Sequence, residues 1–338
     1  MNKCLQLAKL GEYYVAPNPM VGAILVEGAP EGLLWRVDSE RIVGEGWHKE
    51  FGGPHAEVNC FRDAEERGIH DFSNCTLFVS LEPCSHYGKT PPCANLIVEK
   101  GVKRVVIGMK DPNPLVAGKG IEILKQNGIE VVVGVMEAEC RELNKRFLML
   151  QEHHRPYVIL KWAQTKDGFI DKFAPEGPLV ISTPLTKQLV HKMRAENMAI
   201  MVGTNTVLKD NPRLNVTRWV GRNPVRVTVD RHGRLGSSYR RKDSWKIFDD
   251  SAPTIVYRDR TDWEYILSDL AQRGIHSILV EGGATLLNHI LATGIYDEIH
   301  VEVADIEIGD GIKAPEVELN NEYDEIDNHK LYIMRNCK

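Results

Sequence analysis

Two short stretches organise the first half of the chain, PHAE (residues 54–57) and LEPCSHYGKTPPC (residues 81–93). The longer one follows an apolar run, residues 76–81, that is typical of a buried strand, and a helical pattern starts at Cys93. The shorter one opens a segment, residues 55–67, with apolar side chains at helical spacing. Both stretches stand where strands and helices meet, which predicts an α/β fold.

His55, Cys84 and Cys93 are predicted to form a metal site. One imidazole and two thiolates suit a borderline-soft ion, and zinc is the natural occupant. Three protein ligands leave the fourth position to water, and the metal lowers the pKa of that water for attack on an amino-bearing ring carbon. Glu57 is expected to lie near the metal without binding it. It would shuttle protons from the water to the ring nitrogen and the leaving ammonia.

Each of these features also has a simpler explanation. His55 and Glu57 could belong to an ordinary helix surface, and the two cysteines could be core residues. A purely structural zinc site is a further alternative, although no fourth protein ligand is obvious. The order of the residues, with Pro83 directly before Cys84, favours the catalytic site. Cys93 stands at a helix start, where backbone amides and the helix dipole favour a thiolate.

Length and composition are those of an ordinary globular protein. The 338 residues are 43% hydrophobic and 26% charged, which is enough for two domains with separate cores. The net charge of −5 argues against a nucleic-acid surface, and no apolar run approaches the length of a membrane helix. The first residues lack the apolar core of a signal peptide. We therefore expect a cytoplasmic protein whose seven cysteines stay reduced.

Strand and helix patterns alternate throughout the chain. In the first half they predict strands at residues 21–26, 76–81, 104–109 and 131–133, and helices at 55–67, 93–100, 118–127 and 137–150. In the second half they predict strands at 157–160, 199–202, 225–229, 254–257, 278–280, 298–303 and 330–334, and helices at 184–196 and 284–292. Because Pro156 cannot continue the helix before it, we expect domains at residues 1–150 and 151–338.

The spacer between the two cysteines indicates the type of deaminase. His-x-Glu, Pro-Cys and a second Cys are the signature of zinc nucleobase deaminases, in which two residues usually separate the cysteines. Here eight residues separate them, and residues 81–93 resemble the deaminase domain of the RibD family of bifunctional riboflavin-biosynthesis proteins. PNPMVG (17–22), GEGWH (44–48), DPNP (111–114) and GKG (118–120) are similar to the same family. The resemblance covers nearly the whole chain and implies a cytidine-deaminase-like, three-layer first domain.

For that domain the resemblance implies a small-molecule substrate, a 2,5-diamino-6-ribosylamino-pyrimidinone 5′-phosphate, which would lose its 2-amino group as ammonia. It also implies that Asn18, His48, His86 and Lys89 line the substrate pocket. Lys89 could meet the phosphate as a point charge, and the two histidines could donate hydrogen bonds to phosphate or sugar. The simpler alternative for each is a solvated loop residue. Residues 27–40 depart from the family pattern, and we interpret them as an inserted loop or lengthened hairpin that could contact another subunit.

The second half contains a candidate anion site at VEGGAT (residues 280–285), where a strand ends, two glycines turn and a helix begins. Backbone amides at such a helix start suit a pyrophosphate, although a plain turn is the more common structure. No Gly-x-Gly-x-x-Gly follows a first strand, so a Rossmann fingerprint is absent. LKWAQTKDG (160–168), HKMRAE (191–196) and VGTNTVLKDNPRL (202–214) resemble the reductase domain of the RibD family. That domain is similar to dihydrofolate reductase in fold and reduces the ribosyl group to a ribityl chain with NADPH.

The resemblance also implies roles for individual residues of the second half. The NADPH would be bound by Thr206, Asp210, Gly283, Ala284 and Thr285, and the substrate by Lys161, Arg194, Leu214 and Glu281. Lys161 and Glu281 are our candidates for orienting the opened sugar and for proton transfer. The simpler alternatives are a helix-surface cation for Arg194 and a turn residue for Asp210. Val180 and Thr217 depart from the family pattern, and Arg218 could replace the arginine expected at the latter position.

The leading hypothesis is a bifunctional enzyme that performs two consecutive steps of riboflavin synthesis. We expect a homo-oligomer, either a dimer or a tetramer, without nucleic-acid or membrane partners. The alternatives are a deaminase with a catalytically silent reductase-like half, a deaminase of nucleic acids or free nucleosides, and a zinc-stabilised interaction protein. The acidic net charge argues against a polynucleotide substrate, and the phosphate-ready spacer argues against an unphosphorylated nucleoside.

Overall fold

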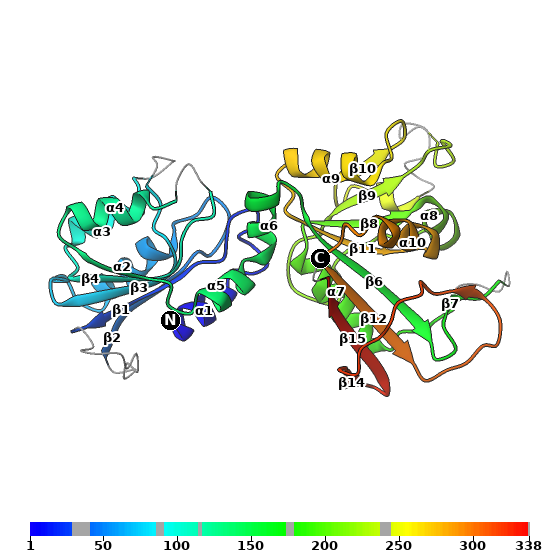
Figure 1. The fold of residues 1–338 in the computed structure, drawn as a ribbon, viewed down its shortest axis with the longest axis horizontal. Helices are drawn as coiled ribbons and strands as arrows, with labels where there is room; N and C mark the ends of the chain where they lie inside the picture. The colour runs from blue at the N-terminus through cyan, green and yellow to red at the C-terminus, as the bar shows by residue number, and fades with distance from the viewer. Residues whose placement is uncertain (29–40, 86–90, 114–116, 174–178, 237–244, 337–338) are drawn as a thin grey trace. The chain divides into compact units, whose positions relative to one another are not determined.

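The computed structural model describes residues 1–28, 41–85, 91–113, 117–173, 179–236 and 245–336 (Figure 1). The chain separates into two compact units, Met1–His153 and His154–Lys338, and each unit has a main sheet of its own. Both units mix helices and strands, so the predicted α/β class is confirmed. No helix in the described part of the chain is long and apolar enough to span a membrane.

The first unit contains a five-stranded sheet with the order β2-β1-β3-β4-β5. Its strands are β1 (Gly22–Glu27), β2 (Ile42–Trp47), β3 (Cys75–Leu81), β4 (Arg104–Met109) and β5 (Glu130–Val133). Its helices are α1 (Asn2–Lys9), α2 (Ala56–Glu66), α3 (Cys93–Lys100), α4 (Lys119–Gln126), α5 (Glu137–Leu143) and α6 (Lys145–His153). β1 is antiparallel to β2 and β3, whereas β3, β4 and β5 are parallel. Most of the expected insertion, residues 29–40, lies outside the described residues.

Helices cover both faces of this sheet, because successive side chains of a strand point to opposite faces. On one face Leu77 and Val105 pack with apolar residues of α2, α3 and α4. On the other face Phe78 and Val106 pack with residues of α1. The unit therefore has three layers, and the turn that leaves the central, fully buried strand β3 reaches the starts of α2 and α3 (Figure 1).

The second unit contains an eight-stranded sheet with the order β10-β9-β8-β11-β6-β12-β15-β14, and β7 pairs with β13 in a small second sheet. The strands are β6 (Tyr157–Thr165), β7 (Phe169–Asp171), β8 (Ala199–Gly203), β9 (Val225–Val229), β10 (Thr254–Tyr257), β11 (Ser277–Gly282), β12 (Glu298–Ala304), β13 (Ile312–Lys313), β14 (Asp324–Ile326) and β15 (His329–Arg335). The helices are α7 (Pro184–Glu196), α8 (Thr204–Asp210), α9 (Trp263–Gln272) and α10 (Ala284–Thr293), with a short 3-10 helix at Lys246–Phe248.

The strands from β10 to β12 are parallel, and β15 and β14 continue the sheet in antiparallel pairing. The pairing of β11 with β8 shifts between Val280 and Gly282, so Glu281 occupies a β-bulge. Bulges re-aim side chains at the edges of functional sites. Just after it, Gly283 adopts a left-handed backbone (φ +71) and α10 begins. The middle of β6 and the carboxyl end of β11 therefore bring Lys161 and Glu281 to the start of α10.

Candidate active sites

The predicted metal ligands converge from the ends of three elements. His55 directly precedes α2, Cys84 follows β3, and Cys93 is the first residue of α3. The Nδ1 atom of His55 lies 3.6 Å from the Sγ atom of Cys84 and 3.4 Å from that of Cys93. Residues that are far apart in the sequence thus place one nitrogen and two sulfurs within 4.8 Å of one another.

These separations fit a tetrahedral zinc ion. With bonds of about 2.3 Å to sulfur and about 2.0 Å to nitrogen, neighbouring ligand atoms of such an ion stand about 3.6 Å apart. Within the described ranges no fourth histidine, cysteine or carboxylate joins the cluster. Three protein donors leave one corner of the tetrahedron to water, which is the arrangement of a catalytic zinc site.

The sulfur of Cys84 is the preferred site of negative charge in this cluster. Hydrogen bonds from the Cys93 thiol, from His55 and from the Cys93 backbone amide lower the pKa of Cys84 to about 4. The amide nitrogen of Cys93 lies 3.3 Å from the Cys84 sulfur. The first amide of α3 is therefore directed at Cys84, and the hydrogen bond between the two thiols raises the pKa of Cys93. The helix start thus favours the thiolate of Cys84, which corrects the expectation that it favours a thiolate at Cys93.

Glu57 lies in the first turn of α2, next to the ligand cluster and outside it. Only 3% of the residue is exposed. Burial raises the pKa of its carboxyl group, and the negative charge on Cys84 acts in the same direction. A raised pKa makes the carboxylate a better proton acceptor than a solvated one, which suits a proton shuttle.

Asn18 and His48 lie beside this cluster. The rings of His48 and His55 stand 5.5 Å apart, edge to face. The Nδ1 atom of His48 lies 3.0 Å from the carbonyl oxygen of Pro54, which only accepts, so Nδ1 carries the proton. Its Nε2 atom then accepts a hydrogen bond from the Asn18 amide at 3.0 Å. Both nitrogens of His48 are engaged within the protein. The arrangement favours an orienting role for His48, with Asn18 as the residue that reaches the substrate.

Two predicted pocket residues, His86 and Lys89, lie outside the described residues. The segment that contains them joins Cys84 to Cys93, so both sit in the spacer between two ligands.

Glu82 is a functional residue to which the sequence analysis gives no role. It is only 4% exposed, and its carboxylate accepts hydrogen bonds from the backbone amides of Asp111, Gly118, Gly120 and Ile121 at 3.0–3.3 Å. A Cβ atom at Gly120 would lie 2.1 Å from the carbonyl oxygen of Pro83, so only glycine fits there. Glu82 thus fixes the start of α4 against the turn that carries Cys84. Its place in the stretch 81–93, directly before Pro83 and Cys84, is the signal that could have identified it.

A cleft of about 450 Å³ in the second unit contains most of the residues predicted for the reductase. The predicted residues that line it are Lys161, Thr206, Asp210, Glu281, Gly283, Ala284 and Thr285. Val180, one of the departures from the family pattern, lines the same cleft and is 67% exposed. Side chains from β6, β11, α8 and α10 thus meet in one cavity.

Glu281 and Arg194 form a partly buried ion pair at this cleft, with 11% and 16% of their side chains exposed. The guanidinium of Arg194 donates to both carboxylate oxygens, at 2.7 and 2.6 Å, and a further nitrogen donates to the carbonyl oxygen of Asn215 at 3.2 Å. Although burial opposes it, the charge of Arg194 lowers the pKa of Glu281. Glu281 is therefore ionised at neutral pH and accepts hydrogen bonds without donating a proton. Arg194 is committed to this carboxylate, which favours a supporting role over direct substrate contact.

Lys161 lies beside Glu281, but burial has the larger effect on the pKa of the lysine. Burial lowers the pKa of its ammonium group, and the carboxylates of Glu302 and Glu281 oppose that effect. A lysine with a lowered pKa gives up a proton more readily than a solvated one. Of our two candidates for proton transfer, Lys161 is thus the better donor, and Glu281 suits orientation.

Leu214 has a left-handed backbone (φ +58) and a buried side chain. The side chain packs with Val202, Val207 and Phe248 in a small core cluster. Any contact of Leu214 with substrate therefore has to come from its backbone. Thr217, which departs from the family pattern, lies nearby in the sequence. Its backbone amide donates a hydrogen bond to Nδ1 of His191 at 3.1 Å.

A second cavity of about 290 Å³ adjoins the cleft, and the two share Asn205, Thr206, Gly283 and Thr285. It extends to the turn after β9, where Arg231, His232 and Arg234 line it. No residue of this turn is among those selected from the sequence. A cationic wall beside a helix start suits an anionic ligand, so the cavity extends the cofactor side of the cleft.

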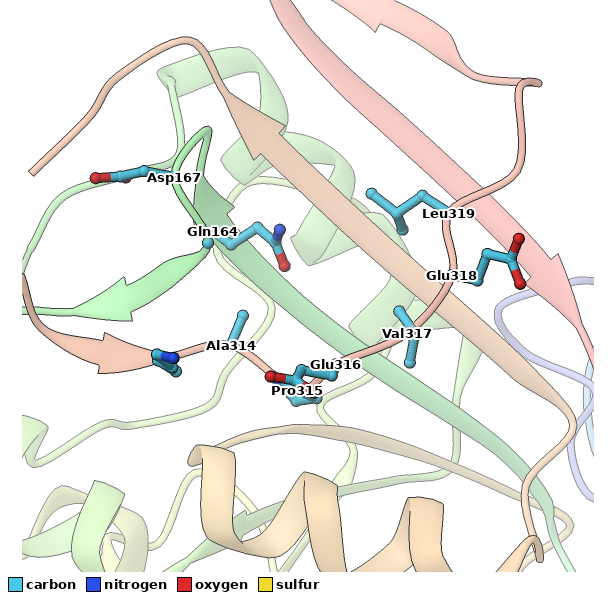
Figure 2. Close-up of a pocket in the computed structure, with 10 residues that line it drawn as sticks. Gln164, Asp167, Ala314, Pro315, Glu316, Val317, Glu318 and Leu319 are labelled. Carbon is cyan, nitrogen blue, oxygen red and sulfur yellow. The ribbon is translucent and has the colours of Figure 1, made fainter. Parts of the chain in front are cut away.

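A third cavity, of about 470 Å³, lies past the end of β6 (Figure 2). Gln164 and Asp167 line one side, and the segment Lys313–Leu319 lines the other. Two of its polar side chains bond within the protein, since Gln164 accepts from the Trp162 indole and Asp167 accepts from the backbone amides of residues 308 and 309. None of the predicted site residues lines this cavity, so we place the chemistry in the cleft around Lys161.

Two family models match the chain. The cytidine and deoxycytidylate deaminase zinc-binding region matches residues 1–109, and the RibD C-terminal domain matches residues 156–323. The first match contains His55, Glu57, Cys84 and Cys93, and the second contains the cleft residues of β6, α8 and β11.

Curated relatives match along almost the whole chain. The riboflavin biosynthesis protein RibD of Aquifex aeolicus is 38% identical over 92% of this chain and 88% of its own length. RibD of Escherichia coli is 34% identical, over 90% and 86%. Among solved structures, the Thermotoga maritima diaminohydroxyphosphoribosylaminopyrimidine deaminase/5-amino-6-(5-phosphoribosylamino)uracil reductase has a TM-score of 0.86 at 37% identity and covers 100% of this chain and 97% of its own. RibD of Acinetobacter baumannii has a TM-score of 0.82 at 33% identity, with 98% and 96% covered.

Proposed function

Since this chain belongs to the RibD family of bifunctional riboflavin-biosynthesis deaminase/reductases, we propose the substrates and residues with which it performs both reactions. The chain combines a zinc-binding deaminase unit and a reductase unit that uses a nicotinamide cofactor. The predicted fold class and the leading functional hypothesis are thereby confirmed, and the hypothesis of a silent reductase half is not favoured. The proposed substrate of the deaminase is the diaminohydroxyphosphoribosylaminopyrimidine that names the Thermotoga relative. The proposed substrate of the reductase is its deaminated product.

In the proposed deamination, residues 1–150 supply the site, and His55, Cys84 and Cys93 hold the zinc. A zinc ion held by these three residues would supply an activated water next to the ring carbon that bears the 2-amino group. Glu57 would take a proton from the attacking water and deliver it to the ring nitrogen. It would then move the proton of the new hydroxyl group to the amino group, which leaves as ammonia. Asn18, held by His48, fixes the ring in place, and His86 and Lys89 of the spacer meet the phosphate.

In the proposed reduction, residues 151–338 act on the opened sugar, whose C1′ is part of an imine. A nicotinamide cofactor bound in the cleft would supply the hydride for C1′. Lys161 gives its proton to the imine nitrogen, which completes the conversion to a ribityl amine. Glu281, fixed by Arg194, accepts hydrogen bonds from the sugar and holds the chain in position, and the backbone at Leu214 completes this side of the cleft.

The cofactor side supports NADPH. Thr206 and Asp210 line the cleft next to Gly283, Ala284 and Thr285, where the start of α10 offers backbone amides to the diphosphate. The adjoining cavity with Arg231 and Arg234 would accept the additional phosphate that distinguishes NADPH from NADH.

The observation that carries the proposal is the presence, in one chain, of a three-ligand site that fits zinc and of a cleft with a buried lysine beside an ionised carboxylate. The test supplies the diaminopyrimidine ribotide phosphate with and without NADPH and follows the products by mass spectrometry. Without NADPH we expect only replacement of the amino nitrogen by oxygen. With NADPH we expect a further gain of a hydride and a proton. Deamination alone under both conditions would contradict the reductase assignment.

A further inference from the structure

A row of three side chains extends from the reductase cleft into the sheet. Lys161 of β6, Glu302 of β12 and His329 of β15 lie on neighbouring strands. Glu302 is paired in register with Ala163 of β6, which lies two residues from Lys161. It is also paired with Leu331 of β15, which lies two residues from His329. Because residues two apart on a strand share a face, all three side chains lie on the same face, on a diagonal.

Glu302 joins the other two members of this row. It is 2% exposed, and its Oε2 atom lies 3.7 Å from the Nζ atom of Lys161 and accepts a hydrogen bond from the Ser182 hydroxyl at 2.7 Å. Its Oε1 atom lies 2.8 Å from the Nδ1 atom of His329, and Thr186 bonds the same carboxylate. One oxygen faces the cleft, which Lys161 and Ser182 both line, and the other faces the histidine.

The charges around Lys161 make Glu302 its principal counter-ion. Of the two carboxylates near the lysine, Glu281 is already neutralised by Arg194. No arginine or other lysine is paired with Glu302 among the ion pairs of the described chain. The other groups that face Lys161 or line its cleft are His300, which is paired with it in register, and Asp171, Lys187, Lys209 and Asp210.

We propose that Glu302, held in place by His329, is a positioning residue of the reductase that keeps Lys161 protonated and directed into the cleft. The proposal rests on the proposed role of Lys161 as proton donor. Glu302 touches neither substrate nor cofactor in this role and acts only through the lysine. His329 donates from Nδ1 to the carboxylate and so fixes the orientation of the charge.

The pH profile of the Glu302→Gln variant tests this role. Glutamine keeps the shape and removes the counter-charge, so burial lowers the pKa of Lys161 further, and the lysine loses its proton at a lower pH. A one-unit shift is a tenfold change in the protonated fraction on the alkaline side. We expect the alkaline limb of the reductase kcat profile to move to lower pH by about one unit or more, so that kcat on that limb falls about tenfold while the acid side keeps the wild-type value and KM is unchanged.

The same strand offers a matched control. Glu298 is 4% exposed, lies on the same face of β12, and is bonded to a histidine, His300, at 3.0 Å. It does not line the cleft. Glu298→Gln is expected to keep the wild-type pH profile, and Glu302→Asp, which retains the charge, is expected to restore most of the alkaline activity.

Cofactor binding, followed by titration of nicotinamide fluorescence, shows whether each variant is folded. If Glu302→Gln binds the cofactor and its profile coincides with wild type, or falls by the same factor at every pH, the proposal is overturned. If that variant fails to bind, His329→Gln decides, because it leaves the carboxylate in place but frees it to turn. An unchanged His329→Gln profile then overturns the proposal, and an alkaline limb moved to lower pH supports it. Absence of reductase turnover in the wild type would instead refute the proposed function itself.

Discussion

The two sites of this protein are built in contrasting ways. The deaminase site takes its ligands from two short stretches, residues 54–57 and 81–93, and each ligand stands at the end of a helix or strand. The reductase cleft takes its groups from β6, β11, β12 and α7, which lie far apart in the sequence. A metal accepts few ligand types, so its site leaves a recognisable pattern. A cleft of buried ion pairs uses common residues, and only the fold shows which of them meet.

Because the two sites use different residues, we expect the loss of a metal ligand to affect the deaminase site and to leave the reductase site unchanged. Cys84→Ser removes the ligand with the most favoured thiolate, so we expect loss of zinc, undetectable deamination and a lower melting temperature of the first unit. Zinc content, ammonia release and calorimetry measure these effects. Cys140→Ser, at a buried cysteine outside the cluster, should retain zinc. Loss of reductase turnover on separately supplied deaminated substrate would contradict the separation.

The second test distinguishes chemistry from metal binding within the first site. Glu57→Gln leaves all three ligands in place but cannot move a proton, so deamination should fall about 10²- to 10⁴-fold while zinc remains bound. Steady-state ammonia release and metal analysis provide the measurement. Glu66→Gln, at an exposed position on the same helix, is the control. Loss of zinc from the Glu57 variant would show that Glu57 is a ligand.

The third test asks how strongly the second site depends on its ion pair. Arg194→Lys keeps the positive charge but cannot donate to both oxygens of Glu281, so the carboxylate loses its fixed orientation. We expect the reductase kcat to fall about 10- to 100-fold with unchanged deamination. Lys192→Gln, two residues away on α7, should have little effect. A wild-type rate in Arg194→Lys would refute the orienting role of the pair.

The smallest expected effect concerns Glu82, which fixes the start of α4 against the turn that carries Cys84. Glu82→Gln replaces a carboxylate that accepts from four backbone amides with a group that has only one acceptor oxygen. We expect the free energy of unfolding of the first unit to fall by about 1–3 kcal/mol, with zinc retained at low temperature. Denaturant titration measures the change. A stability equal to wild type would mean that water replaces these bonds.

Much of the fold could be predicted because periodic apolar residues report burial directly. The strand at residues 104–109 and the helix at 184–196 have the predicted bounds. At the latter, Thr183 and Thr186 form a reciprocal cap that fixes the helix start. The helix ending before Gly101 is also as predicted, because that glycine adopts the left-handed conformation that ends helices (φ +68).

Other bounds are wrong for physical reasons. The pattern predicted that a strand opens at residues 157–160, and β6 continues to Thr165. Its second half was not recognised because Lys161, which faces the cleft, interrupts the apolar run. The predicted helix at 137–150 is two helices, divided at Asn144. The Asn144 side chain bonds both backbone groups of Met20, a partner 124 residues away that local patterns do not show.

Three helices, α1, α8 and α9, are absent from the sequence predictions. For α9 the signal was present, since Asp262 caps the helix and Trp263, Ile266 and Leu270 recur at helical spacing on its buried face. α8 is short and rich in polar and β-branched residues, so its packing on β8 decides its conformation. In the sites, Glu302 could not be recognised because its importance comes from its neighbours on other strands.

The hydrogen bonds between Asn144 and Met20 help to determine how long a fragment must be to form the first catalytic unit. The zinc-binding family match ends at residue 109, but Leu81 and Met109 pack with Cys140 and Leu148 of the two later helices. A fragment that stops at 109 would expose this apolar patch and leave the backbone of Met20, near Asn18, without its amide partner. An autonomous deaminase therefore has to extend through α6, so the shortest self-sufficient gene segment is longer than the recognisable motif.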